Sequence, residues 1–157
     1  MTAKLAGDSR NLPVYSVVGD RYEFLVTGAE TNGAYAVFDA LVPPGGGTPP
    51  HIHRREDEAF HVIEGEFEFT VDGESVRVVS GGSLFARRDI PHNFKNVGAD
   101  PGRLLIIVTP AGLENYFAEV GVRLPSRDFN PVPPSQEDIA KLISIAPHYG
   151  LELLLDH

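Results

Sequence analysis

Short apolar segments, separated by glycine, proline and aspartate, fill the chain from Tyr15 to Pro110. In residues 67–71 apolar side chains alternate with polar ones, which is the two-residue period of a half-buried strand. Asp72-Gly73, which follows, is typical of a hairpin turn. Strands are predicted at residues 22–26, 33–42, 60–63, 67–71, 76–78, 84–86 and 104–108, and around Phe94.

These short strands, about eight or nine with turn signals between them, favour an antiparallel sandwich or barrel, so the predicted fold class is all-β. Residues 104–108 form an unbroken apolar run, which predicts a strand covered on both faces. No helical periodicity is present between Tyr15 and Pro110.

Helical periodicity begins after Pro110. Apolar residues at helical spacing predict a helix over 113–120, and Gly121 supplies its stop. The proline-rich residues 125–134 predict an extended connector. A second helix is predicted from Ser135, a good N-cap, to Pro147. Its apolar stripe is Ile139, Leu142, Ile143 and Ala146. We expect both helices to pack against the barrel or a partner subunit.

A length of 157 residues suits one domain, with a barrel core at about 15–110 and a helical C-terminal extension at 111–157. The absence of cysteine excludes disulfides and thiolate metal sites and suits a reducing compartment. No apolar run has the length of a signal peptide core or a membrane span, so we expect a cytoplasmic protein without a membrane partner.

The formal net charge is -9, from 13 basic and 22 acidic residues. Such a surface repels phosphate backbones, so a nucleic-acid partner is not expected. The sequence also contains no P-loop, GxGxxG or GxSxG motif, which argues against phosphate cradles and serine-hydrolase chemistry.

Two histidines are separated by one residue in His51-Ile52-His53. Because side chains two apart on a strand point to the same side, both imidazoles can face one cavity. Glu58 lies five residues beyond His53, which would be the opposite face of a straight strand. The polar residues 54–57 suit a turn, and a reversal there would return Glu58 to the histidine cavity.

His92 is a fourth candidate ligand. With His51, His53 and Glu58 it gives three imidazoles and one carboxylate, which suit a divalent ion of Fe, Mn, Ni, Cu, Co or Zn. Four protein ligands around an octahedral ion leave two open positions for a substrate or O₂. We therefore expect a catalytic site rather than a structural one.

Other polar residues near these positions have ordinary alternatives. Glu56 and Asp57 compete for the carboxylate position, although a solvated turn is their more usual role. His61, His148 and His157 are expected to be surface or otherwise satisfied residues rather than ligands.

The sequence resembles the cupins at two motifs. The first is a glycine, five residues, HxH, three or four residues, a glutamate, six residues and a glycine, and this chain matches it with Gly45, His51, His53, Glu58 and Gly65.

Gly81, His92 and Asn96 match the second cupin motif. Arg87 and Asp89 stand where the family usually has proline and glycine. Neither departure affects a candidate ligand.

The resemblance implies a double-stranded β-helix, or jelly roll, in which His51, His53, Glu58 and His92 hold one divalent metal ion. Such barrels commonly form homodimers. Within the cupins, the chain looks most like small single-domain proteins similar to quercetin 2,3-dioxygenases, which open a flavonol ring with O₂. By that resemblance Glu58 would also be the catalytic base that takes the hydroxyl proton of the substrate.

Arg87 has two interpretations, a solvated turn or a guanidinium at the cavity mouth that pairs with an anionic substrate. Several aromatic residues are candidates for an apolar lining that holds a planar ring, with plain core packing as the alternative for each. They are Phe60, Phe67, Phe69, Phe85 and Phe94.

Three functions fit these features. The first is a metal-dependent dioxygenase that acts on a small enol or phenol, such as a flavonol, with O₂ as co-substrate. The second is a metal-dependent decarboxylase or isomerase that needs no O₂. The third is a non-catalytic cupin that binds a small molecule. Turnover without O₂ would select the second, and recovery of an intact ligand without turnover would support the third.

Overall fold

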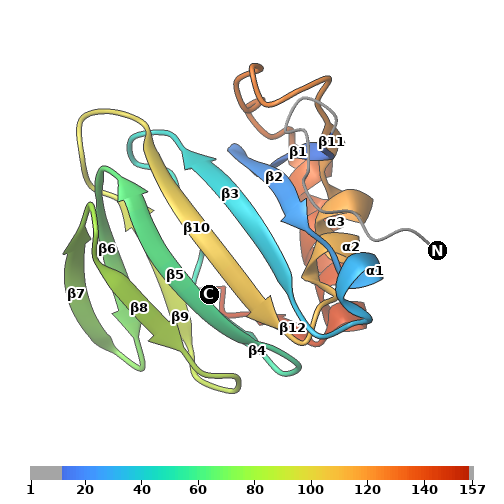
Figure 1. The fold of residues 1–157 in the computed structure, drawn as a ribbon, viewed down its shortest axis with the longest axis horizontal. Helices are drawn as coiled ribbons and strands as arrows, with labels where there is room; N and C mark the ends of the chain where they lie inside the picture. Colours follow the sequence, from blue (N-terminus) through green and yellow to red (C-terminus); the bar gives the residue numbers. More distant parts are fainter. Residues whose placement is uncertain (1–11, 156–157) are drawn as a thin grey trace.

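The computed structural model describes residues 12–155, which form two antiparallel β-sheets with helices at one end (Figure 1). The seven-stranded sheet has the order β11-β1-β2-β3-β10-β5-β8, and the five-stranded sheet has the order β12-β4-β9-β6-β7. The strands are β1 (Val14–Val17), β2 (Asp20–Val26), β3 (Ala36–Val42), β4 (His51–His53), β5 (Asp57–Glu64), β6 (Glu66–Val71), β7 (Glu74–Val79), β8 (Ser83–Ala86), β9 (His92–Asn96), β10 (Gly102–Thr109), β11 (Val122–Arg123) and β12 (Leu151–Leu153). The all-β jelly-roll prediction is confirmed.

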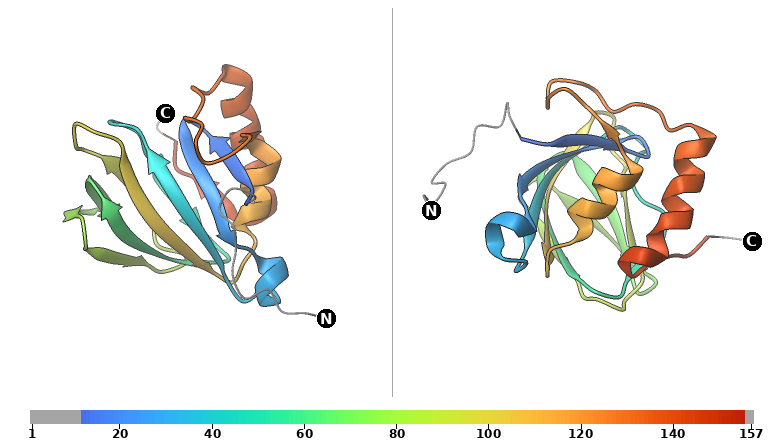
Figure 2. Two further views of the ribbon diagram at one scale, coloured as in Figure 1. Left: turned by 45° about the horizontal axis from the view of Figure 1, so that its top comes forward. Right: turned by 90° about the vertical axis from the view of Figure 1, so that its right-hand side faces the viewer.

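Three α-helices accompany the sheets: α1 (Gly28–Thr31), α2 (Leu113–Val120) and α3 (Gln136–Ile145). In the right-hand view of Figure 2 the strands form a ring, α2 lies across its opening, and α3 stands beside α2. The C-terminal extension therefore covers one end of the barrel. None of the described helices is long and apolar enough to cross a membrane.

Both predicted C-terminal helices are present. The hydroxyl oxygen of Ser135 accepts a hydrogen bond from the backbone N–H of Asp138 at 3.1 Å, which begins α3 as an N-cap. The expected apolar stripe of α3 is only partly buried. Ala146 is buried, but Ile139 and Ile143 are 40% and 39% exposed in the single chain, because α3 contacts the molecule with one edge of that stripe.

The prediction that residues 104–108 are covered on both faces is wrong. Leu104, Ile106 and Val108 are buried between the sheets, whereas Ile107 on the opposite face is 37% exposed. β10 pairs with β3 and β5 in an antiparallel sheet, and within residues 12–155 of the single chain no second layer covers its outer face.

α1 was not expected, because four residues are too few to show a helical period. The Glu30 carboxylate accepts a hydrogen bond from the Thr27 N–H at 3.2 Å and stabilises this turn. As a consequence β3 begins at Ala36, later than the predicted 33.

β12 also lacks a clear sequence signal and lies in the C-terminal extension, beyond the helix that was predicted to end at Pro147. It pairs with β4, with Leu151 opposite His53 and Leu153 opposite His51. The C-terminal segment therefore supports the strand that carries both histidines.

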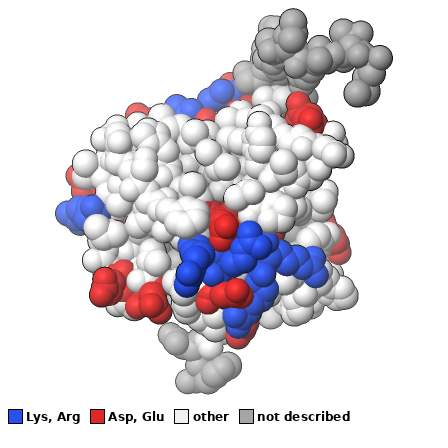
Figure 3. Space-filling model, turned by 60° about the horizontal axis from the view of Figure 1, so that its bottom comes forward, with Lys and Arg blue, Asp and Glu red and all other residues white. Residues whose placement is uncertain are grey.

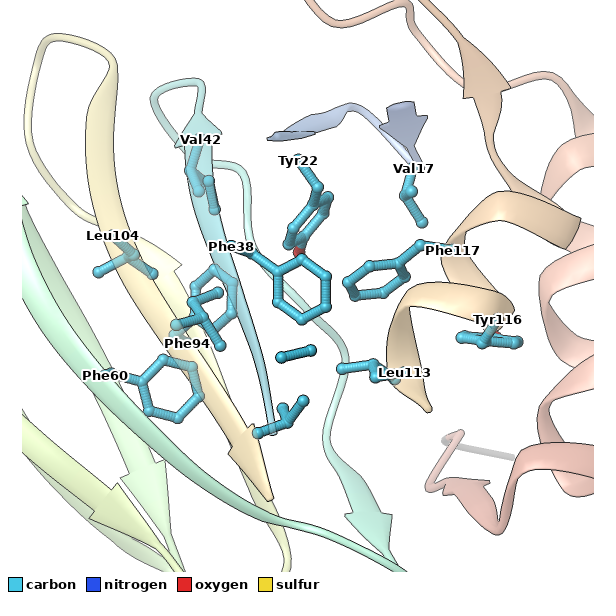
Figure 4. Packing of buried hydrophobic residues seen from close by; sticks show 14 of the residues in the cluster. Val17, Tyr22, Phe38, Val42, Phe60, Phe94, Leu104, Leu113, Tyr116 and Phe117 are labelled. Carbon is cyan, nitrogen blue, oxygen red and sulfur yellow. The ribbon is translucent and has the colours of Figure 1, made fainter. Parts of the chain in front are cut away.

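Aromatic side chains fill the core beneath α2, as Figure 4 shows. The ring centroid of Tyr22 on β2 lies 4.4 Å from that of Phe117 on α2, and Phe38 on β3 lies 5.3 Å from the same ring. Full burial of one such side chain stabilises the fold by about 1.5–3 kcal/mol. This cluster fixes α2 over the end of the barrel.

Candidate metal centre

The four candidate ligands come from three strands in two sheets. His51 and His53 are the ends of β4, and His92 begins β9, where it lies directly opposite His51. Glu58 is on β5 in the other sheet. The chain turns the corner between the sheets at residues 54–56, so the predicted reversal brings Glu58 back toward the histidines.

One ligand atom from each of the four side chains lies within 4.8 Å of all the others, and all four side chains are buried. The Nε2 atoms of His51 and His53 are 3.1 Å apart. Glu58 Oε1 lies 3.2 Å from Nε2 of His53 and 2.9 Å from Nε2 of His92. The structure thus brings together the four residues that the sequence singled out.

The outer nitrogens of two rings face backbone carbonyls. His51 Nδ1 lies 2.8 Å from the Pro49 oxygen, and His92 Nδ1 lies 3.3 Å from the Ile90 oxygen. Because a carbonyl oxygen only accepts, each neutral ring carries its proton on Nδ1 and directs the Nε2 lone pair inward. Inward lone pairs beside a carboxylate repel one another, and a bound cation relieves this repulsion.

Glu56 supplies the corresponding partner for the third ring. Its Oε1 lies 3.1 Å from His53 Nδ1, and its side chain is only 4% exposed. The expected role of Glu56 in a solvated turn is therefore wrong. A carboxylate behind a metal-bound histidine is the usual way to fix the ring and its tautomer. Spacing alone gave no signal for this role, because it depends on the turn being folded inward.

The two histidines of β4 have very different pKa values in the metal-free centre. Burial lowers the pKa of His51 to about 3, with further repulsion from His53 and His92. Burial alone would also lower the pKa of His53, but attraction to Glu58 and the hydrogen bond to Glu56 outweigh it and raise this pKa to about 9. Burial opposes ionisation of Glu58, yet His53 outweighs that cost and the pKa of Glu58 lies below its usual range. Without an ion, Glu58 thus pairs with a protonated His53.

A cavity of about 80 Å³ adjoins the centre, and His51, His53 and Glu58 form part of its wall. The remaining wall is mostly apolar and includes side chains of both sheets, α2 and α3. Examples are Val17, Phe94, Ile106, Leu113, Phe117 and Leu142. Among residues 12–155, the lining contains no lysine or arginine.

Only some of the candidate aromatic residues reach this cavity. Phe94 lines it. Phe60 and Phe67 do not, because both pack into the core, where the Phe60 ring stands 5.9 Å from the His92 ring, edge to face. Phe69 is also a fully buried core residue, whereas Phe85 is 60% exposed on the outer face of β8.

Arg87 is exposed and does not line the cavity. Figure 3 shows basic side chains, interspersed with acidic ones, at the end of the barrel where the β4–β5 and β8–β9 loops lie. Arg88 there pairs with Asp57 at 3.2 Å. The contact of Arg87 with an anionic substrate stays a prediction, which its position does not favour.

The second departure from the motif has a local explanation. Asp89 has a φ of 69°, a left-handed conformation that glycine adopts freely and aspartate tolerates. Its N–H donates to the His53 carbonyl at 2.9 Å. The turn before His92 is thereby tied to the strand that carries the other histidines.

The other histidines in the described part of the chain, His61 and His148, are not part of the cluster. His61 is exposed, and its Nδ1 lies 2.8 Å from the Ser83 hydroxyl. His148 is exposed in the 3₁₀ turn Ala146–Tyr149. His157 lies outside the described residues.

Comparisons with known proteins agree with this fold. Residues 38–108 match the cupin domain family. The chain is 29% identical over 115 residues to the polyketide synthase CurC of Streptomyces cyaneus, and the match covers 72% of this chain and 73% of that protein.

Two solved structures illustrate the structural likeness. An RmlC-like cupin from Shewanella frigidimarina superposes with a TM-score of 0.62 at 20% identity, covering 71% of this chain and 96% of that one. An oxalate oxidase superposes with a TM-score of 0.52 at 26% identity, covering 71% and 61%. Residues 38–108 are therefore similar to the cupin domain family, and the protein has the fold of these cupin structures, with a buried ligand set suited to one divalent metal ion.

Proposed function

We propose that this cupin-fold protein is a metal-dependent enzyme that binds a small, largely apolar enol or phenol in the barrel cavity and oxidises it with O₂. The observation that carries the proposal is the position of His51, His53 and Glu58 in the wall of a cavity whose remaining lining is mostly apolar.

The chemistry of the donor set supports a metal ion at this point. His51, His53 and His92 would offer their Nε2 lone pairs, and Glu58 would offer a carboxylate oxygen. When bound, the ion would supply Lewis acidity and, if redox-active, electron transfer to O₂.

The lining of the cavity favours a hydroxyl-bearing ring or enol over a dianion such as oxalate. A dianion in an apolar cavity requires compensating positive charge, and no lysine or arginine of residues 12–155 lines this one. An enol or phenol enters neutral and ionises only at the centre. The apolar walls, including Phe94 and Phe117, would hold its carbon skeleton and exclude water.

Glu58 is the residue proposed to take the hydroxyl proton. It is buried in the wall of the cavity, and as a carboxylate it has oxygens that can accept a proton from a hydroxyl group. Glu56 and the carbonyls of Pro49 and Ile90 hold the histidine rings in one orientation while this proton moves.

The size of the cavity bears on the substrate. A volume of about 80 Å³ is small beside the roughly 300–1,000 Å³ of typical ligand sites. A single-ring enol or phenol therefore fits the proposal better than a flavonol. The similarity to a protein named as a polyketide synthase also supports a carbonyl-rich, enolisable substrate.

The test is O₂ consumption by protein loaded separately with Fe, Mn, Ni, Cu, Co or Zn, against a panel of single-ring phenols, enols and flavonols. We expect turnover with a redox-active ion and a loss of about 10²-fold or more in Glu58→Gln, which keeps the shape of the side chain but not the base. His61→Ala is the control, because His61 is exposed and away from the centre. No O₂ consumption with any metal and any panel member would overturn the proposal.

A redox-neutral decarboxylation or isomerisation at the same centre is the second candidate. It is favoured by Glu58, whose buried carboxylate can move a proton whether or not O₂ is present. Product formed under strictly anaerobic conditions would select it, and an intact ligand co-purified without any turnover would select a binding protein instead. The expected homodimer stays a prediction that sedimentation velocity can test.

A further inference from the structure

A buried acid outside the ligand set shares the cavity with the metal centre. Asp20 is the first residue of β2, just after the tight turn at Val18 and Gly19, whose φ values are 49° and 88°. Its alternation with Tyr22 and Phe24 places all three side chains on the inner face of the sheet. This is a position at which the pattern calls for an apolar residue.

The protein is built closely around this carboxyl group. Asp20 is 3% exposed and lines the same cavity as His51 and His53. A Cβ atom at Gly46 would lie 3.1 Å from Asp20 Oδ1, so the glycine at this point of the loop leaves the room that the carboxyl occupies.

Among residues 12–155, no protein group donates a hydrogen bond to the Asp20 carboxyl. An ionised carboxylate in such surroundings carries a large desolvation cost, so the neutral acid is favoured. Burial accordingly raises the pKa of Asp20 well above its usual range. A neutral carboxyl group differs from a carboxylate in one essential respect, which is that it can donate a hydrogen bond.

We propose that Asp20 is a specificity-determining residue that donates a hydrogen bond to a carbonyl oxygen of the substrate, remote from the hydroxyl group that meets the metal centre. The inference rests on the proposed function and narrows it to hydroxy-carbonyl compounds. The centre and Glu58 would recognise the hydroxyl group of the substrate and Asp20 its carbonyl group, and the rest of the cavity that these residues line is mostly apolar.

The arrangement also accounts for an acid at an inward position that would otherwise only cost stability. A carboxyl group that serves the fold is normally paired, whereas no group of residues 12–155 donates to this one, which leaves its hydrogen-bonding capacity for a ligand. Replacement of Asp20 by leucine should therefore separate two properties, raising thermal stability while lowering affinity for a carbonyl-bearing ligand.

The experiment compares two probes of similar shape, 4-hydroxyacetophenone and 4-ethylphenol, which differ in the carbonyl group. Dissociation constants are measured by calorimetry with zinc-loaded protein, so that no turnover is needed. In Asp20→Leu we expect affinity for 4-hydroxyacetophenone to fall by about three- to tenfold, the usual value of one neutral hydrogen bond, with little change for 4-ethylphenol. Asp20→Asn, which keeps an N–H donor, should lose less affinity for 4-hydroxyacetophenone than Asp20→Leu does.

Asp72→Asn is the matched control, because Asp72 is exposed in the hairpin turn between β6 and β7. Asp20→Leu should also melt at a higher temperature than the wild type and Asp20→Asn at about the same temperature, and a cooperative transition in each shows that it folds. If Asp20→Leu lowered the affinity for both probes equally, or lowered neither affinity, the role of Asp20 would be overturned while the proposed function stayed intact. Failure of both probes to bind zinc-loaded wild-type protein would overturn the two together.

Discussion

At the scale of single residues, the outer nitrogen of each imidazole determines what its inner nitrogen can do. Acceptors at Pro49, Ile90 and Glu56 hold the proton on Nδ1 in all three rings of the centre. In each neutral ring Nε2 is then left as a lone-pair donor directed at Glu58 or at another ring, and His53 reaches this state when it loses its second proton. The preference for a cation is thus set by the surroundings of the ligands as much as by the ligands.

Removal of one ligand should release the ion without unfolding the barrel. In His92→Ala we expect metal content after dialysis to fall by more than about tenfold, because the site loses one of three imidazoles. Elemental analysis measures the content, and circular dichroism confirms the β-sheet signal. His61→Ala, a change of the same kind at an exposed site, should retain the wild-type metal content. Full retention in His92→Ala would contradict the ligand assignment.

Glu56 should act through His53 rather than on the metal ion. Glu56→Gln removes the charge that orients this ring and should weaken metal affinity by about 10- to 100-fold. Asp57→Asn is the matched control, because Asp57 is the adjacent acid but pairs with Arg88 at the surface. Competition with a fluorescent chelator measures both affinities. Equal effects of the two substitutions would show that Glu56 has no special role.

The sequence allowed the ligands to be predicted because their positions follow from local rules. His51 and His53 are related by strand parity, and Glu58 by a turn with clear polar character. Glu56 and Asp20 escaped prediction for a physical reason. Their roles depend on burial, which arises when the β4–β5 turn and the β1–β2 turn fold against distant parts of the chain.

At the scale of elements, the loop before β4 fixes the position of β9. Gly47 has a φ of 146°, and a Cβ atom there would lie 2.0 Å from the Phe94 carbonyl oxygen. The neighbouring Thr48 N–H donates to the same oxygen at 3.0 Å. The glycine lets the loop backbone approach β9, the strand that begins with His92.

Gly47→Ala should therefore destabilise the fold by about 3 kcal/mol or more, since overpacking adds to the cost of the left-handed backbone. Gly45→Ala is a closely matched control in the same loop, because its φ is 78° but no atom lies within 4 Å of the added Cβ. It should cost only about 1–2 kcal/mol. Urea unfolding measures both. If the two variants lost similar amounts of unfolding free energy, the close approach of Gly47 to Phe94 would not contribute to the stability of the fold.

Strands were predicted correctly where apolar and polar side chains alternate strongly. Strands that exist only because they pair with a neighbouring strand, without such alternation, were missed. Residues 67–71 formed β6 as predicted, with Phe67 and Phe69 fully buried. β11 and β12 are short, and each is held by one partner, β1 and β4 respectively. The exposed outer face of β10 was mispredicted, because an unbroken apolar run does not reveal whether a second layer will cover it.

At the scale of the whole molecule, the cavity is a joint product of both sheets and the C-terminal helices. Leu113 and Phe117 of α2 and Leu142 of α3 line it together with the β4 histidines. The Tyr116 hydroxyl donates to the Leu142 carbonyl at 2.7 Å and joins the two helices. No local sequence rule predicts such a lining, since it depends on how the extension packs against the barrel.

Metal binding should be coupled to the stability of the whole fold through one proton. His53, with a pKa of about 9 in the metal-free protein, is protonated at neutral pH and must lose that proton to become a ligand. The stabilising His53–Glu58 ion pair of the metal-free protein is fully present below the unfolded histidine pKa of about 6.5 and is lost as the pH rises through 9. Metal affinity has the opposite dependence and should rise about tenfold per pH unit across this window.

The difference in melting temperature between zinc-loaded and metal-free protein should consequently grow from pH 6 to pH 9, by an amount that corresponds to about 1.4 kcal/mol per pH unit at fixed free zinc. Differential scanning fluorimetry at matched ionic strength measures it. Glu56→Gln provides an internal check, because the hydrogen bond from Glu56 helps to raise the pKa of His53. In this variant the difference between the melting temperatures of zinc-loaded and metal-free protein should stop increasing at a lower pH than in the wild type. A difference that is constant or shrinks toward pH 9 would mean that His53 is not a proton-competed ligand of the ion.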